Sequence, residues 1–452
     1  MARSPIQKLS RSPIRAFIVL LLLFITYQLL SFSDDPTSSS SPPKTSDVAS
    51  SSPAEVDACE GLEGLDEVFV ALRTGVTEAP KKLPAHFTTM LRCVPHFKLY
   101  SDYAEVIEGH TVHDVLADVN PDIISTHPDF EYYTKLQSAG GRGAFTAEEM
   151  GAWAAAKNTM SGHDSPGWRL DKWKFLPMAA KALAAAPARV KWFVFAESDT
   201  YILWKAWLAW LERFDASEPW YMGQQMQIGD VVFAYGGAGF AVSRPALEKV
   251  IAHREKNLKS YDDFTANHWA GDCVLGKALF DVGVGLHWSF PTLVNEDPAG
   301  LDFDSNFSGE QRKPWCYYAA SFHHMTPADV HDFYEFEQNW YRSNTTLMRH
   351  KDIFWNYVFP RMASQVSDWD NHCEDEQPNE TTFKACRAAC EADAKCMQFS
   401  VTGYVCKTSS VLHLGREASA AKQVTSGWMM DRIGAYVDRL EAPCAAGDRD
   451  FT

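Results

Sequence analysis

The feature that most restricts the fold of this chain is an apolar run, Trp192 to Ala196, that stops at the acidic turn Glu197-Ser198-Asp199. Successive side chains of a strand point to opposite faces, so an unbroken apolar run predicts a strand covered on both faces, as in the middle of an α/β sheet. Ligands of open α/β sheets bind beyond the carboxyl ends of the strands, where two carboxylates could hold a hard cation. The alternative is a solvated acidic turn that caps the next helix.

Two segments nearer the N-terminus predict neighbouring strands. Residues 65–72 and 97–100 read as strands, with a helix ending near Arg92 between them. A crossover of this length favours parallel pairing. Arg73 and Asp102 then fall at the same sheet edge as Glu197 and Asp199, unless they are ordinary loop charges.

Residues 170–186 are mostly strong helix formers and lead directly into the opening strand. This predicted helix carries Lys174. After the acidic turn, Trp204, Trp207 and Trp210 recur at three-residue spacing. We interpret this stripe as core, in preference to a platform for sugar rings.

Three later segments add candidate site residues. Gly236, Gly237 and Gly239 lack side chains, so a backbone could approach a ligand closely there; a β-bulge without a ligand is the alternative. Asp272 stands near the start of a predicted helix, which by itself only suits the helix dipole. His323 ends an apolar stretch and could complete a metal site with the carboxylates, or serve structure alone.

The N-terminus predicts membrane attachment. Residues 16–32 are apolar and uncharged, which is just long enough for a transmembrane helix, and basic residues precede them. We therefore expect a cytosolic tail at 1–15, a signal anchor at 16–32 and a Ser/Pro-rich disordered stalk at 33–58. A cleaved signal peptide is the competing interpretation.

The rest of the composition fits a lumenal globular head. A net charge of −16 argues against nucleic acid as a partner. Ten cysteines suit an oxidising compartment. Glycosylation sequons begin at Asn306, Asn344 and Asn379. The cysteines cluster in residues 366–452, where disulfides are expected and zinc binding is the alternative.

Five segments in order resemble the family 31 glycosyltransferases, and most closely the fungal type of the core 1 β1,3-galactosyltransferase-like branch, which includes relatives of Fringe. The segments are LRTG at 72–75, AESDTY at 196–201, YGGAGFAVS at 235–243, GDCVLG at 271–276 and SFHH at 321–324. The resemblance spans roughly residues 59–345. It implies a GT-A domain at 59–365, an α/β fold with a mixed, mostly parallel sheet and a nucleotide-sugar pocket at its carboxyl edge.

Residues 366–452 resemble a small disulfide-rich PAN/apple module. That resemblance implies the pairs Cys390–Cys396, Cys386–Cys406 and Cys373–Cys444. Such modules bind protein or carbohydrate, and this one could equally be a structural cap.

The family resemblance also implies a set of site residues. Mn²⁺ would be held by Glu197, Asp199 and His323, although Glu197 stands where the family motif has aspartate. The donor, a UDP-sugar, would be lined by a larger set: Arg73, Thr74, Asp102, Lys174, Glu197, Asp199, Gly236 and Gly237. Asp272 is the implied catalytic base. The family has an acidic residue where this chain has Gly271, so Glu296 and Asp297 remain alternative bases.

We therefore expect an inverting, Mn²⁺-dependent transferase that moves a hexose, galactose in β1,3 linkage, from a UDP-sugar to a glycoprotein or glycan. The alternatives are a Fringe-like N-acetylglucosaminyltransferase and a non-catalytic lumenal protein that binds glycan or protein. The expected location is the Golgi or ER membrane, with a type II topology and a lumenal head.

Overall fold

The central strands β1 (Val68–Arg73) and β5 (Trp192–Glu197) are parallel neighbours, as the apolar run predicts. All of β1 is buried, and β5 is buried up to Ala196. The computed structural model describes residues 59–154, 165–307, 312–378, 380–442, 444 and 450–452. The predicted tail, anchor and stalk, and the sequon at Asn379, lie outside these residues. Among the described residues no helix has the length and apolar character to cross a membrane.

The main sheet has eight strands in the order β11-β7-β10-β5-β1-β2-β4-β3. Four of its pairings are parallel, β1–β2, β1–β5, β2–β4 and β7–β11. Strands β10 and β3 run antiparallel to their neighbours. The sheet is therefore mixed and mostly parallel, as expected for GT-A. Its other strands are β2 (Phe97–Ser101), β3 (Glu105–Ile107), β4 (His110–Asp114), β7 (Tyr221–Gly223), β10 (Phe240–Ser243) and β11 (Leu286–Trp288).

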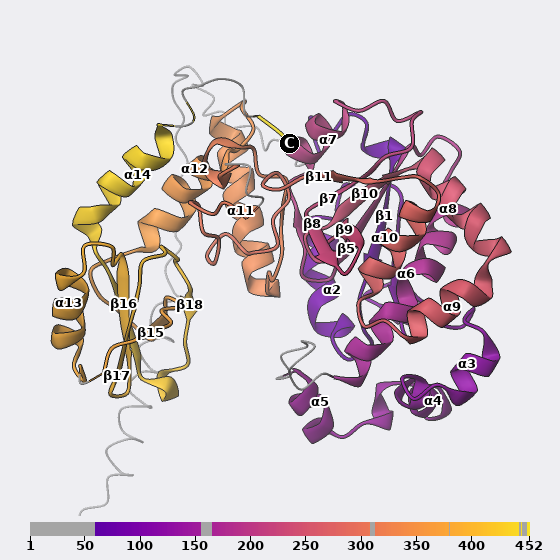
Figure 1. Cartoon of the computed structure of the whole chain (residues 1–452), viewed down its shortest axis with the longest axis horizontal. Helices are drawn as coiled ribbons and strands as arrows, with labels where there is room; N and C mark the ends of the chain where they lie inside the picture. Colours follow the sequence, from indigo (N-terminus) through magenta and orange to yellow (C-terminus); the bar gives the residue numbers. More distant parts are fainter. Residues whose placement is uncertain (1–58, 155–164, 308–311, 379, 443, 445–449) are drawn as a thin grey trace, which may run out of the picture. The chain divides into compact units, whose positions relative to one another are not determined.

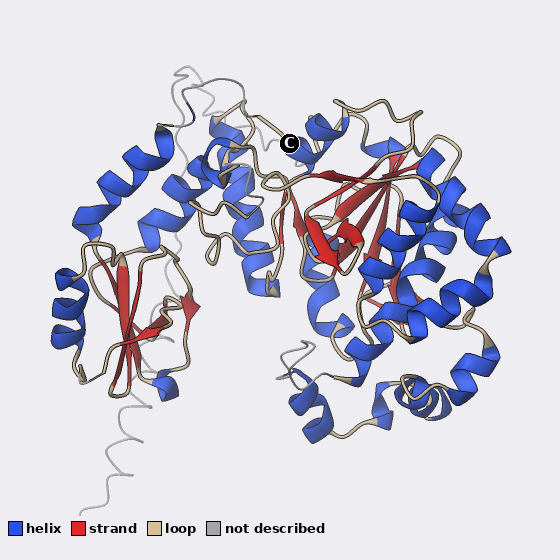
Figure 2. Cartoon of the chain, in the orientation of Figure 1, coloured by secondary structure: helices blue, strands red, loops and turns tan. Residues whose placement is uncertain are grey.

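Helices cover both faces of this sheet (Figures 1 and 2). One face packs on α2 (Ala79–Thr88), α7 (Trp204–Leu211) and α11 (Pro327–Ser343). The other packs on α4 (Phe130–Ser138), α6 (Pro166–Ala185), α8 (Arg244–Lys256) and α10 (Gly271–Asp281). The tryptophan stripe on α7 is core, because Trp207 and Trp210 are both 0 % exposed.

Shorter elements connect these layers. The helices are α3 (Pro121–Thr126), α5 (Ala147–Ala154), α9 (Leu258–Ala266) and α12 (His350–Ile353). Two small ladders join β6 (Tyr201–Ile202) to β12 (Ser321–Phe322) and β8 (Gln225–Ile228) to β9 (Val231–Ala234). The β6–β12 ladder matters for function, because it brings the segment before His323 beside the acidic turn.

Residues from 366 onward form a second, five-stranded sheet in the order β13-β19-β16-β17-β15. Its elements are β13 (Val366–Ser367), β15 (Asp375–Glu376), α13 (Phe383–Ala392), β16 (Gln398–Thr402), β17 (Val405–Ser409) and β19 (Val424–Trp428). A separate ladder joins β14 (Trp369–Asp370) to β18 (Arg416–Glu417). We call residues 366–452 the C-terminal module.

Two of the three disulfides implied for this module are present and one is wrong. Cys390–Cys396 and Cys386–Cys406 tie α13 to the adjoining sheet. Cys444 pairs with Cys316 instead of Cys373, because α14 (Ile433–Glu441) packs against the 3₁₀ turn at Pro314–Cys316. Cys373 is a buried free thiol, as is Cys273. A fourth disulfide, Cys59–Cys93, fastens the start of the described chain.

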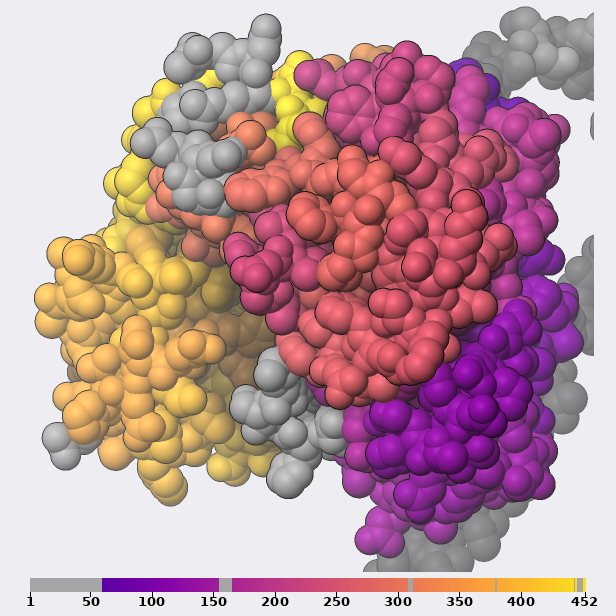
Figure 3. Space-filling view, turned by 45° about the vertical axis from the view of Figure 1, so that its right-hand side comes forward, coloured from indigo at the N-terminus to yellow at the C-terminus, as the bar shows by residue number. Residues whose placement is uncertain are grey.

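The C-terminal module packs directly on the α/β part of the chain. Its Trp428 and Leu414 belong to the same apolar core as α11 and β1. The backbone N–H of Leu414 donates to the carbonyl of Ala299 at 2.8 Å. In Figure 3 the orange and yellow residues of the module lie side by side with the coral residues that precede it. The predicted division at 365/366 thus separates two sheets that share one core.

Helix α6 crosses the start of α10 at very short range. It begins at Pro166, earlier than the sequence predicts, because the Ser165 hydroxyl accepts a hydrogen bond from the Trp168 N–H. A Cβ built on Gly271 would lie 2.6 Å from the Cα of Lys172. Only glycine fits there, so the packing of α6 on α10 explains Gly271 at this position.

Gly271→Ala should therefore lower stability by about 1–3 kcal/mol, since backbone must move to admit the methyl group. Gly434→Ala is the matched control, because a Cβ at Gly434 meets nothing within 4 Å. Thermal unfolding of both variants measures the difference. Equal melting temperatures for the two variants would contradict the close crossing.

Candidate functional site

Asp199, at the end of β5, and His323, after β12, meet at the carboxyl edge of the sheet. The Nε2 atom of His323 lies 3.2 Å from Asp199 Oδ1. Potential ligand atoms of Asp199, His323 and His324 all lie within 4.8 Å of one another. The sequence predicted two members of this cluster but not His324, although the motif SFHH contains it. Glu197 is not a member, and its role as a ligand stays a prediction.

Strong local charges surround Asp199. Burial would raise the pKa of this carboxyl group, but His323 and Lys82 together hold it well below its usual range. Burial likewise opposes protonation of His323, but Asp199 outweighs burial and raises its pKa. The Lys82 ammonium lies 3.1 Å from Asp199 Oδ2 and 2.6 Å from Glu78 Oε2. The Asp199 carboxylate is therefore ionised and is compensated by His323 and Lys82.

Asn295 fixes the orientation of the His323 ring. The Nδ1–H of His323 donates to Asn295 Oδ1 at 2.9 Å, which leaves Nε2 as the nitrogen that faces Asp199. Metal-binding histidines are commonly oriented by such a partner on the other ring nitrogen. One carboxylate and two imidazoles can together bind a divalent transition-metal ion. The residues present therefore fit a divalent cation.

The glycine-rich loop is built for the close approach of these side chains. A Cβ on Gly237 would lie 2.5 Å from the Nδ1 atom of His323. A Cβ on Gly236 would lie 3.0 Å from Glu197 Oε1 and 3.5 Å from Asp272 Oδ2. His323, Glu197 and Asp272 therefore pack against the backbone of this loop. Any larger residue at Gly237 would displace His323.

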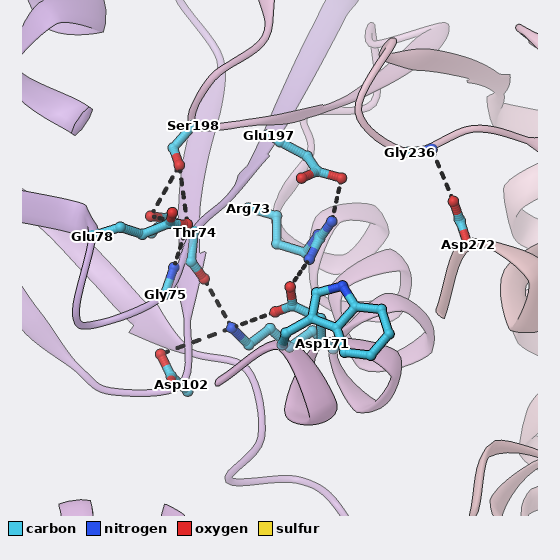
Figure 4. A network of polar contacts seen from close by, with 12 residues as sticks. Arg73, Thr74, Gly75, Glu78, Asp102, Asp171, Glu197, Ser198, Gly236 and Asp272 are labelled. Atoms are coloured by element: carbon cyan, nitrogen blue, oxygen red, sulfur yellow. Dashed lines mark hydrogen bonds and ion pairs between the residues drawn. The ribbon is translucent and has the colours of Figure 1, made fainter. Parts of the chain in front are cut away.

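Arg73 and Glu197 belong to an ion-pair network next to the glycine-rich loop (Figure 4). The parallel register of β1 and β5 sets Arg73 opposite Glu197, and the two form an ion pair. The other guanidinium nitrogen lies 2.6 Å from Asp171 on α6. These two carboxylates raise the pKa of Arg73 against the effect of burial. The Glu197 carboxylate is therefore already neutralised.

Lys174 extends the network to the ends of β1 and β2. Its Nζ atom donates to the Thr74 carbonyl at 2.9 Å and lies 2.8 Å from Asp171 Oδ1. Asp102 accepts a hydrogen bond from the Val76 N–H at 2.7 Å and lies 3.8 Å from Lys174. Lys174 is 0 % exposed. The network therefore holds the ends of β1 and β2 and helix α6 in fixed positions.

A cavity of about 1020 Å³ opens beside this candidate metal-binding cluster, and Asp199 and His324 are among its lining residues. Of the residues predicted from the sequence, Asp102, Lys174 and Asp199 line it, together with the alternative bases Glu296 and Asp297. Arg73, Thr74, Glu197, Gly236, Gly237, Asp272 and His323 are not among its lining residues. The lining also includes Lys81, Lys82, Trp168, His324, His372 and Arg416, which the sequence analysis did not assign to the site.

Asp272 lies at the start of α10, close to Glu197, and is not among the lining residues of this cavity. Burial and the neighbouring Glu197 raise the pKa of its carboxyl group to about 6. Oδ2 accepts the Gly236 N–H at 3.0 Å. Of the alternative bases, Asp297 is ion-paired with Arg416 at 2.5 Å, and burial raises the pKa of Glu296. Of the three candidate bases, Asp272 is the one with a hydrogen bond to the glycine-rich loop in the described residues.

A family model described as Fringe-like matches residues 153–289. That span contains α6, the acidic turn, the glycine-rich loop and Asp272. The match supports a Fringe-related glycosyltransferase. A search of curated proteins found no match to the chain. A glycosyltransferase requires an activated sugar donor and an acceptor. The cavity beside Asp199 could receive them, because its lining includes Asp102 after β2 and two members of the candidate metal cluster, Asp199 and His324.

Asp199→Ala should abolish Mn²⁺ binding or weaken it by more than about 100-fold. The variant removes a proposed direct ligand, and loss of a residue that only orients a ligand already lowers metal affinity by about 10–100-fold. Glu197→Gln is the matched control and should bind Mn²⁺ within a few-fold of wild type. Titration calorimetry without sugar donor gives both affinities. Equal losses in the two variants would show that Glu197 is also a ligand.

Proposed function

We propose that this chain is an inverting, Mn²⁺-dependent glycosyltransferase that moves a hexose, galactose in β1,3 linkage, from a UDP-sugar to a glycoprotein or glycan acceptor. The observation that carries the proposal is the cluster of Asp199, His323 and His324 at the carboxyl edge of a mixed sheet, beside a cavity of about 1020 Å³. The Fringe-like match over residues 153–289 supports the same class of reaction.

Asp199, His323 and His324 would hold the cation. Bound there, Mn²⁺ supplies Lewis-acid stabilisation of the negative charge that develops on the departing diphosphate. Lys82 contacts Asp199 and also lines the cavity, so its ammonium can stabilise the negative charge on the departing diphosphate as well. Lys174 and Asp102 keep the strand ends in place around the donor.

Asp272 is the proposed general base. It takes the proton of the acceptor hydroxyl, whose oxygen attacks the anomeric carbon from the face opposite the leaving group. The bond from that carbon to the UDP oxygen breaks, and its electrons leave on the diphosphate. One displacement inverts the anomeric centre. A carboxylate whose pKa is about 6 is well matched to this task near neutral pH.

We also consider a second donor, because the matching family model is described as Fringe-like. A Fringe-like enzyme that transfers N-acetylglucosamine would use the same cation site and base, and would differ in how the cavity receives the sugar. For either donor we propose a GT-A domain at 59–365, a PAN/apple-like module at 366–452 and a type II anchor in the Golgi or ER membrane.

The full-length chain with Mn²⁺ should release UDP from UDP-galactose faster than from UDP-glucose, and UDP-N-acetylglucosamine tests the second candidate. Chelation by EDTA should remove the activity, and added Mn²⁺ should restore it. A coupled assay for UDP measures all three donors. Tight UDP binding with no turnover on any donor would instead identify a non-catalytic binding protein.

Turnover should fall as the pH drops through about 6, because Asp272 must be ionised to accept a proton and its pKa is about 6. Asp272→Asn should lose turnover at every pH while donor and Mn²⁺ binding remain. The measurement is kcat/KM between pH 5 and 8. An unchanged profile in Asp272→Asn would exclude this residue as the base and return attention to Glu296.

A further inference from the structure

We infer that the C-terminal module is part of the active site, and that its Arg416 is a positioning residue for the metal ligand His323. The inference rests on the proposed cation site. Arg416 lies outside both the residues that match the family model and the cluster of Asp199, His323 and His324. The residues that link Arg416 to His323 are Asp297, Glu296 and Asn295.

The segment that leads into β18 and carries Arg416 is held by hydrogen bonds on both sides. The N–H groups of Leu414 and Gly415 donate to the carbonyl of Ala299 at 2.8 and 3.0 Å. On the module side, Trp369 Nε1 donates to the Leu414 carbonyl at 2.6 Å. Gly415 has a φ of +73°, and a Cβ there would lie 2.6 Å from the Cα of Asn371. These contacts fix the backbone beside Arg416, whose side chain lines the cavity.

Arg416 ends on a buried carboxylate. Its Nη2 atom lies 2.5 Å from Oδ2 of Asp297, which is 7 % exposed. The other carboxylate oxygen accepts the Gly300 N–H at 2.6 Å. A buried carboxylate without its cation is strongly unfavourable, so loss of Arg416 should make Asp297 and its turn rearrange.

The turn that holds Asp297 also holds His323. The His323 N–H donates to the Glu296 carbonyl at 3.1 Å, and its ring donates to Asn295 Oδ1 at 2.9 Å. Leu293 forms a parallel bridge with Ser321 just before this point. Residues 293–297 therefore run beside the metal-binding segment, and Arg416 anchors their far end.

The test is Mn²⁺ affinity of the full-length chain, measured by calorimetry without sugar donor. Arg416→Ala should weaken binding about tenfold, the lower end of the effect of outer partners on metal sites. Asp297→Asn should do the same, and the double variant should be no worse than either single variant. Arg416→Lys should restore most of the affinity.

Arg387→Ala is the matched control, because Arg387 lies in the same module, pairs with Glu391 at 2.8 Å and has a side chain 48 % exposed against 47 % for Arg416. It should bind Mn²⁺ as wild type does. The double variant leaves no buried charge unpaired, so it keeps the test valid if Arg416→Ala folds poorly.

Two results overturn the inference, and they are distinguishable. Wild-type affinity in folded Arg416→Ala refutes the positioning role alone, and a raised acceptor KM in that variant would show direct contact with substrate. A wild-type chain that binds no Mn²⁺ refutes the proposed cation site as well.

Discussion

The parallel pairing of β1 with β5 is the constraint on which the site depends, because it sets Arg73 directly opposite Glu197. Strand ends covered on both faces leave charged groups little access to water, and isolated buried charges cost several kcal/mol each. The chain offsets this cost by alternating charges across β1, β5, α6 and the residue after β2, with Arg73 and Lys174 between Glu197, Asp171 and Asp102. That network neutralises one acid of the turn and leaves Asp199 to face the cavity.

Asp199 is compensated by two groups that lie outside this network. Lys82 and His323 both contact it, and both sit at or next to the cavity. The two acids of the turn therefore have different surroundings. Glu197 belongs to the internal ion-pair network, whereas Asp199 lies with His323 and His324 in the cluster that could hold a metal ion. The glycine-rich loop makes this division possible, because side chains at Gly236 and Gly237 would occupy the space of Glu197 and His323.

Sequence patterns predicted those parts of the structure that depend on local periodicity. The buried strand, the crossover helices and the position of Asp199 follow from apolar runs and from where they stop. Contacts between distant segments did not follow. No spacing rule connects Arg416 to Asp297 or Cys316 to Cys444, because both depend on how the C-terminal module packs on the first sheet. The packing of α6 against α10 likewise explains why residue 271 is glycine. From the sequence alone, Gly271 was only a departure from a motif.

The measurement that most directly tests the central claim is pulsed electron paramagnetic resonance of Mn²⁺ bound to the chain, with and without ¹⁵N-labelled histidine. Ligation by His323 and His324 predicts hyperfine coupling to imidazole nitrogen that changes with the label, and a loss of part of that coupling in His324→Ala. A bound ion with oxygen ligands alone would contradict the account, because the cluster of Asp199, His323 and His324 would then not be the cation site.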